Sequence, residues 1–115
     1  ENLSGRADDM LVIRGVNVFP TQIEEVLFQI PEIGPHYEIL VERKNRLDVM
    51  TITVELVDDR LLDSYSMLSE LEARIKKGLK AQLGLATQIK LVAPYSLQRF
   101  EGKAKRVTDL RKDGL

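Results

Sequence analysis

The chain has 115 residues, of which 43% are hydrophobic and 30% are charged, a composition typical of one globular domain. Its 17 basic and 18 acidic residues leave a net charge of −1, which argues against a protein that binds nucleic acid or a membrane surface. The lack of cysteine, the single histidine and the lack of a bilayer-length apolar run exclude disulfides, multi-histidine metal sites and membrane spans. With no visible signal peptide, the expected location is cytoplasmic.

The first predicted element is a bent strand or a short hairpin. Met10–Ile13 is an apolar run of strand length, and Val16–Phe19 resumes it after Gly15. An isolated glycine within a strand pattern indicates either a bend or a place where another molecule approaches the backbone closely.

A helix follows the second apolar run. Thr21 and Glu24 have the spacing of a capping box, which predicts that the helix begins there. Pro31 predicts its end. The apolar residues recur at helical spacing and define one buried face: Ile23, Val26, Leu27 and Ile30.

The middle of the chain predicts an antiparallel strand pair and then a second helix. His36–Arg43 and Met50–Leu56 both alternate apolar and polar residues, with a polar turn between them. The helix begins between Leu61 and Ser66, buries a leucine-rich stripe and ends at Gly84, a natural C-cap.

The last predicted strand is Gln88–Val92, and residues 96–115 are polar and weakly periodic, which predicts a tail or a mobile loop. The resulting order is β-α-β-β-α-β. Two amphipathic helices and a small, mostly antiparallel sheet favour an α+β domain in two layers, with both helices on one face. This small domain is expected to span residues 10–95.

Several residues with catalytic potential have simpler interpretations. His36 has no partner for a metal site, and Asp58 with Asp59 sits where helix caps are common. Lys103 follows a glycine but precedes Ala104, so this is not a phosphate-binding loop of the Walker type. No metal site is predicted.

Two segments remain unexplained by packing alone. Residues 5–20 combine a Gly-Arg pair, two aspartates and the isolated Gly15. Residues 96–106 are basic and contain Gly102-Lys103. From composition alone, the second segment is a solvated tail in which Lys105 and Arg106 are surface charges. The other interpretation is a loop that brings a cation to a phosphate.

Both segments resemble motifs of the adenylate-forming enzymes. Residues 5–9 (Gly-Arg-Ala-Asp-Asp) resemble the hinge of that superfamily, and residues 102–103 (Gly-Lys) resemble its C-terminal lysine motif. Residues 14–24 and 101–104 are similar to the phenylacetate–CoA ligase family. The resemblance implies a C-terminal domain with a hinge at 1–9 and a catalytic-lysine loop and tail at 96–115.

In this family a large N-terminal adenylation domain holds ATP and the acid. Because this sequence lacks it, we expect an excised domain that is inactive alone and binds no cofactor alone. The resemblance implies that the full enzyme joins a carboxylic acid, aryl or phenylacetate-like, to ATP with Mg²⁺. The acyl-adenylate then passes to coenzyme A as a thioester.

The resemblance also implies a role for four residues. Lys103 neutralises charge during adenylation, and Asp8 is the hinge about which the small domain turns between the two steps. Arg6 lies near the nucleotide ribose, and the pantetheine arm of coenzyme A passes the backbone at Gly15.

Two other interpretations stay open from the sequence. One is a coenzyme F390 synthetase-like adenylyltransferase domain, which would form no thioester. The other is a free-standing ACT-like module that binds a small regulatory ligand. A homodimer of the full-length enzyme also remains open.

Overall fold

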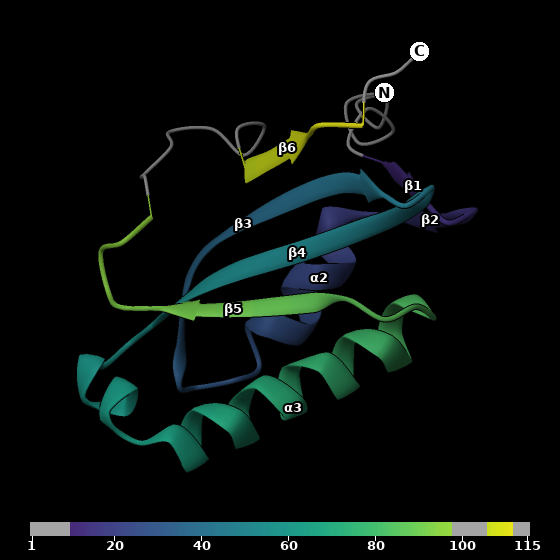
Figure 1. Ribbon diagram of the computed structural model, residues 1–115. Helices are drawn as coiled ribbons and strands as arrows, with labels where there is room; N and C mark the ends of the chain where they lie inside the picture. Colours follow the sequence, from purple (N-terminus) through teal and green to yellow (C-terminus); the bar gives the residue numbers. More distant parts are fainter. Residues whose placement is uncertain (1–9, 98–105, 112–115) are drawn as a thin grey trace, which may run out of the picture.

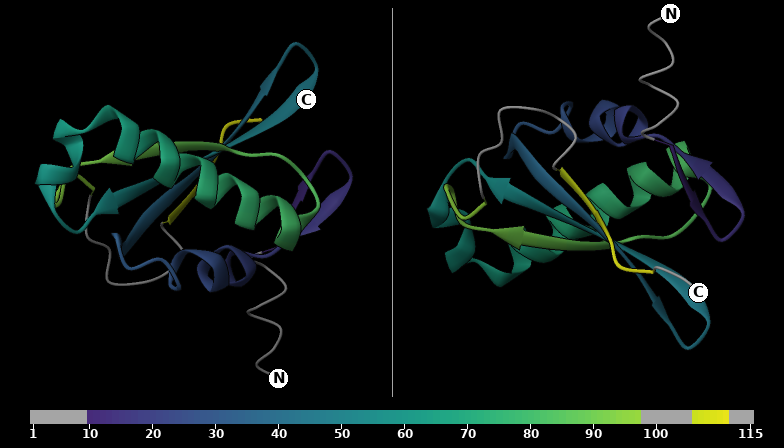
Figure 2. Two further views of the ribbon diagram at one scale, coloured as in Figure 1. Left: turned by 90° about the horizontal axis from the view of Figure 1, so that it is seen from below. Right: turned by 90° about the horizontal axis from the view of Figure 1, so that it is seen from above.

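The computed structural model describes residues 10–97 and 106–111. They form a hairpin and a four-stranded sheet, with two helices on one face of that sheet (Figures 1 and 2). The α+β class with both helices on one face is therefore confirmed. In chain order the elements are β1 (Leu11–Ile13), β2 (Val16–Val18), α2 (Pro20–Leu27), β3 (Ile33–Lys44), β4 (Leu47–Leu56), the 3-10 helix η1 (Asp59–Asp63), α3 (Tyr65–Leu83), β5 (Gln88–Val92) and β6 (Val107–Asp109).

The N-terminal apolar runs form a hairpin, one of the two predicted forms. β1 and β2 pair antiparallel as a separate two-stranded sheet. The turn between them consists of Arg14 and Gly15, with φ of 52° and 79°. Two positive φ values in succession define the tight turn that suits the twist of a hairpin. Ile13 and Val18 are fully buried, so the hairpin packs on the core without joining the main sheet.

Helix α2 begins at Pro20, and the predicted Thr21–Glu24 capping box is wrong. Proline has a fixed φ that suits the first helical position, so the N-cap is Phe19, two residues before Thr21. The Phe19 N–H donates to Gln22 Oε1 at 2.9 Å, which satisfies one backbone donor at this end. Glu24 instead bonds to Tyr37 on β3 and to Arg106, the residue before β6.

Helix α3 follows the prediction at both ends. It begins at Tyr65, within the expected range, and the Ser64 Oγ accepts from the Met67 N–H at 3.3 Å. It ends at Leu83, and Gly84 adopts φ 83° as the C-cap.

The main sheet has the order β5-β4-β3-β6 and mixed pairing. β3 and β4 are antiparallel, as predicted, while β5 pairs parallel with β4 and β6 pairs parallel with β3. The expectation of a mostly antiparallel sheet is therefore wrong in detail. Strand β5 is reached only after α3 has crossed the length of the sheet, and such a crossover returns the chain in the same direction.

Strand β6 was not predicted, because residues 96–115 were interpreted as a tail or loop. It is three residues long, and Val107 is its only half-buried side chain. Three residues are too few for an alternating pattern to be visible in a sequence. Its register places Val107 opposite Ile39, at the edge of the sheet.

The core lies between the helices and the covered face of the sheet. Leu71, Ile75 and Leu79 of α3 are buried, as the leucine-rich stripe predicts. Helix α2 ends at Leu27, before the predicted stop at Pro31, although Ile30 beyond it is also buried. In residues 10–97 and 106–111, no helix has both the length and the apolar character needed to cross a membrane.

Candidate functional site

Of the four site residues predicted from sequence, the structure describes only Gly15. Arg6, Asp8 and Lys103 lie outside the described residues. Gly15 is exposed at the tip of the β1–β2 hairpin, and a Cβ added there would have no atom of the described chain within 4 Å. The glycine is therefore required by its positive φ and not by packing within this domain.

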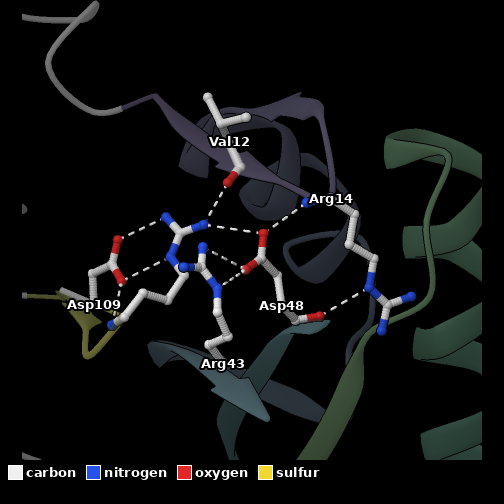
Figure 3. A network of polar contacts seen from close by, with 6 residues as sticks. Val12, Arg14, Arg43, Asp48 and Asp109 are labelled. Atoms are coloured by element: carbon white, nitrogen blue, oxygen red, sulfur yellow. Dashed lines mark hydrogen bonds and ion pairs between the residues drawn. The ribbon is translucent and has the colours of Figure 1, made fainter. Parts of the chain in front are cut away.

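A group of polar contacts holds this hairpin against the sheet (Figure 3). We call it the Asp48 network, and its members are Val12, Arg14, Arg43, Asp48, Asp109 and Arg111. The Arg14 N–H donates to Asp48 Oδ2 at 2.9 Å, and the Arg14 Nε donates to the Asp48 carbonyl oxygen at 2.8 Å. The residue beside Gly15 is thus bonded to the start of β4 through both its backbone and its side chain.

Arg111 connects the same hairpin to the C-terminal strand. Its Nη1 donates to the Val12 carbonyl oxygen at 2.6 Å and to Asp48 Oδ2 at 3.2 Å. Its Nε and Nη2 donate to the two oxygens of Asp109 at 3.0 and 2.8 Å. One guanidinium therefore joins β1, β4 and the end of β6.

The hydrogen bonds of this network, with help from its charges, lower the pKa of both carboxylates. The Arg14 N–H is the main cause of the lowered pKa of Asp48, helped by Arg43, whose Nε donates to Asp48 Oδ1 at 3.1 Å. The hydrogen bond from Arg111 likewise lowers the pKa of Asp109. Both groups are held as carboxylates, which fixes the hairpin tip on the sheet.

A second group of contacts joins α2, β3 and the start of β6. We call it the Tyr37 cluster, and its members are Glu24, Tyr37 and Arg106. The Tyr37 hydroxyl donates to Glu24 Oε2 at 2.6 Å, and Arg106 Nη1 donates to the same oxygen at 3.2 Å. The Arg106 guanidinium carbon lies 4.7 Å from the centre of the Tyr37 ring. Arg106 is therefore held by a carboxylate and a ring face at once.

The cluster is largely removed from solvent. The side chains of Arg106 and Glu24 are 22% and 17% exposed. Burial, followed by the hydrogen bond to Glu24, raises the pKa of Tyr37 to about 12. The expectation that Arg106 is a solvated surface charge is therefore wrong.

A lysine-rimmed pocket lies at the C-terminal end of α3. It has a volume of about 450 Å³ and is lined by Lys76, Lys77, Lys80, Ala81, Ala86 and Thr87. The Thr87 hydroxyl is buried and has no hydrogen-bond partner within the described part of the chain. A neighbouring pocket shares Lys76, Ala86 and Thr87 and is also lined by Arg14. The two pockets therefore adjoin each other, one beside Arg14 and the other beside Lys77 and Lys80.

The described residues offer no metal centre. Among residues 10–97 and 106–111, no three histidine or acidic side chains are close enough together to hold an ion. Asp58 caps η1 by accepting from the Arg60 N–H at 2.9 Å, the role predicted for this acid pair.

The Asp48 network, the Tyr37 cluster and the lysine pocket are not predictable from local sequence patterns. Glu24 and Arg106 are 82 positions apart, so only the fold brings them together. Lys76 and Lys80 do share one helix face at i, i+4 spacing, and this signal was available in the sequence.

Residues 15–111 match the model of the AMP-binding enzyme C-terminal domain family. The chain is 40% identical over 111 residues to the phenylacetate-coenzyme A ligase of Escherichia coli K12, covering 96% of this chain and 25% of that protein. It is 43% identical over 109 residues to the enzyme of the same name from Pseudomonas putida, covering 95% and 25%. The chain thus spans about a quarter of the length of these relatives.

Solved structures agree with this likeness. A domain of phenylacetate-coenzyme A ligase from Bacteroides vulgatus superposes with a TM-score of 0.81 at 40% identity, covering 93% of this chain and 97% of that one. A 2-hydroxyisobutyryl-CoA ligase, with 2-HIB-AMP and CoA in its thioesterification state, superposes with a TM-score of 0.79 at 30% identity. That match covers 88% of this chain and 21% of the ligase.

Proposed function

The chain belongs to the family of AMP-binding enzyme C-terminal domains, and we propose that it serves an acid–CoA ligase of the phenylacetate type. The observation that supports this proposal is the identity of 40–43% with phenylacetate-coenzyme A ligases over almost the whole chain. The family assignment disfavours an ACT-like module, which would have no such relatives. A coenzyme F390 synthetase-like domain remains the second candidate, and it would form no thioester.

We propose that the complete enzyme forms an acyl-adenylate from ATP and an aryl acid and then transfers the acyl group to coenzyme A. In the first step an anionic carboxylate meets an anionic phosphate, and the ammonium of Lys103 offsets that repulsion. Arg6 lies near the nucleotide.

For the second step, the hairpin tip presents Gly15 toward the thiol-bearing arm of coenzyme A. Support comes from the exposed turn, the open space around its Cα and the Asp48 network that fixes it. The pocket beside Arg14 adjoins the pocket lined by Lys77 and Lys80, whose charges suit the phosphates at the other end of coenzyme A. Ala81 and Ala86 supply an apolar surface for the adenine.

In this proposal Asp8 is the hinge residue about which the small domain turns, because the two steps require that domain in two orientations. An Asp8→Pro change fixes φ near −65° and restricts the preceding residue as well. We expect one half-reaction to continue in the full-length enzyme and the other to fall sharply. If the Asp8→Pro enzyme ran both half-reactions at normal rates, measured separately, Asp8 would not be the hinge.

The proposed function is tested with the chain alone and with the full-length enzyme. ATP–pyrophosphate exchange by the 115-residue chain should stay at background, because the adenylation domain is expected to hold ATP and the acid. The full-length enzyme should exchange pyrophosphate in the presence of aryl acids and then consume coenzyme A. Exchange without thioester formation would favour the coenzyme F390 synthetase-like candidate. Exchange by the chain alone would contradict the proposal that the adenylation domain holds ATP and the acid.

A further inference from the structure

The β1–β2 hairpin is joined to the rest of the domain in two different ways. At its base, the side chains of Ile13 and Val18 are fully buried in the core. At its tip the turn is exposed, and neither strand pairs with the main sheet. Within the described residues, every hydrogen bond from the hairpin to the sheet or to the C-terminal segment ends on Asp48 or Arg111. The direction in which the tip points therefore depends on these two side chains.

Arg111 is itself fixed to the main sheet. Its Nε and Nη2 donate to the two carboxylate oxygens of Asp109 in β6, which pairs parallel with β3. The neighbouring Leu110 N–H donates to the carbonyl oxygen of Val41 at 2.8 Å. Because the guanidinium is a rigid plane, these bonds also set the position of Nη1, the atom that donates to the Val12 carbonyl oxygen in β1 (Figure 3). The Arg111 side chain is only 16% exposed.

We propose that Arg111 is a positioning residue for thioester formation and acts through the hairpin tip that carries Gly15. This inference rests on the proposed function. Two routes of described contacts lead from Arg111 to the tip. One is its bond to the carbonyl of Val12, and the other is its bond to Asp48 Oδ2, the oxygen that accepts from the Arg14 N–H.

Both routes end within three positions of Gly15, where the arm of coenzyme A is proposed to pass. A tip that moves would present this passage in the productive place less often, and small misplacements of a bound reactant are costly in rate. Loss of Arg111 leaves Ile13 and Val18 in the core, so we expect the domain to stay folded and only the tip to move. A purely stabilising residue would instead affect both half-reactions alike.

The test uses the full-length enzyme and measures the two half-reactions separately. Arg111→Gln should lower kcat/KM for coenzyme A about tenfold with supplied acyl-adenylate, while ATP–pyrophosphate exchange stays near normal. Arg111→Lys should recover part of the loss, because it keeps the charge but not the planar set of donors. In a Gly15→Asn background the loss should be less than additive, because both changes act at the same tip.

Hydrogen exchange supplies a readout that is independent of activity. In the full-length Arg111→Gln enzyme, amides of residues 10–19 should exchange faster than in wild type, while those of α3 should not. Unchanged exchange in residues 10–19 would show that Arg111 does not hold the hairpin, and the inference would be wrong.

Arg106→Gln is the matched control. Arg106 lies at the other end of β6 and has a similarly buried side chain, but its described bonds go to the Tyr37 cluster. Its variant should form thioester from supplied acyl-adenylate near the normal rate. Equal losses in both half-reactions of Arg111→Gln, or normal thioester formation by it, would overturn the positioning role alone. An unaltered enzyme that formed no thioester would instead refute the proposed function, and this role with it.

Discussion

Two arginines flank β6 and look alike in the sequence, yet they hold different regions of the molecule. Arg106 joins the start of the strand to the Tyr37 cluster, on the side of the lysine motif. Arg111 follows the strand and joins the Asp48 network, on the side of the Gly15 hairpin. A three-residue strand thus connects the region assigned to adenylation with the region assigned to thioester formation.

The two regions are held in different ways. The Tyr37 cluster uses one carboxylate and one ring that belong to core elements. The Asp48 network fixes a hairpin that does not pair with the main sheet, and its outer members are exposed: the Arg43 side chain is 51% exposed. We therefore expect salt to weaken the outer part of the Asp48 network more than the Tyr37 cluster. Changes in the two regions should therefore affect different half-reactions.

The largest effect should follow from Lys103→Ala in the full-length enzyme. Removal of one preorganised electrostatic contact typically costs about 10²- to 10³-fold in rate, and we expect this loss in ATP–pyrophosphate exchange. Thioester formation from supplied acyl-adenylate should remain near normal, because the thiol step has less charge repulsion. Lys105→Ala is the control. Arg106 is unsuitable as a second control, because it belongs to the Tyr37 cluster. If Lys105→Ala selectively lost ATP–pyrophosphate exchange and Lys103→Ala did not, the lysine of the motif would be Lys105.

A change at Gly15 should have the opposite selectivity. Gly15→Leu would place a side chain in the proposed path of the coenzyme A arm, but it would also strain a backbone at φ 79°. The sharper variant is therefore Gly15→Asn. Asparagine tolerates positive φ, and nothing in the described domain obstructs its Cβ. We expect about a tenfold loss in thioester formation, near 1.4 kcal/mol, with adenylation intact.

Gly84→Asn is the matched control for that experiment. Gly84 has φ 83° and equally open surroundings, but it caps α3 and lies outside the hairpin. Its variant should run both half-reactions normally. If Gly15→Asn also formed thioester at the normal rate, the proposal that coenzyme A passes Gly15 would be wrong.

The longer elements of the fold were predictable from the sequence, but β6 and the contacts that hold the two regions were not. Period-2 and period-3.6 patterns revealed β3, β4 and α3, because long elements repeat their buried positions many times. β6 is too short to repeat. Glu24 was assigned to a local cap three residues from Thr21, whereas its true partners lie 13 and 82 positions away. Such long-range partners have no local signature.

Asp48→Asn should destabilise the packing of the hairpin by about 1.5–3 kcal/mol, the usual contribution of a hydrogen bond to a charged group. The pKa of Asp48 is lowered in the folded state, so its carboxylate stabilises the fold above the ordinary pKa of roughly 3.9. That contribution is lost as the pH falls through the lowered value. Urea unfolding of wild type and variant should therefore differ at neutral pH and converge in acid.

Asp63→Asn is the control for the charge itself. Asp63 is exposed at the end of η1, and no ion pair to it is found in the part of the chain that the structure describes. Its variant should match wild type across the same pH range. A constant difference for Asp48→Asn down to strong acid would show that packing, and not the ionised carboxylate, stabilises the hairpin.

The smallest effect is expected at the lysine-rimmed pocket. Lys76 already pairs with Glu72 at 3.1 Å, which leaves Lys77 and Lys80 as the cations for a bound phosphate. Solvent-exposed ion pairs contribute about 0.2–1 kcal/mol, so Lys80→Ala should raise the KM for coenzyme A about threefold and leave the KM for ATP unchanged. Lys90→Ala removes an equally exposed lysine from β5 and should change neither constant. Added salt should raise the wild-type KM toward that of Lys80→Ala, because screening weakens the same contact. If Lys90→Ala raised the KM as much as Lys80→Ala, the effect would come from overall charge, and the pocket would not be where the phosphates bind.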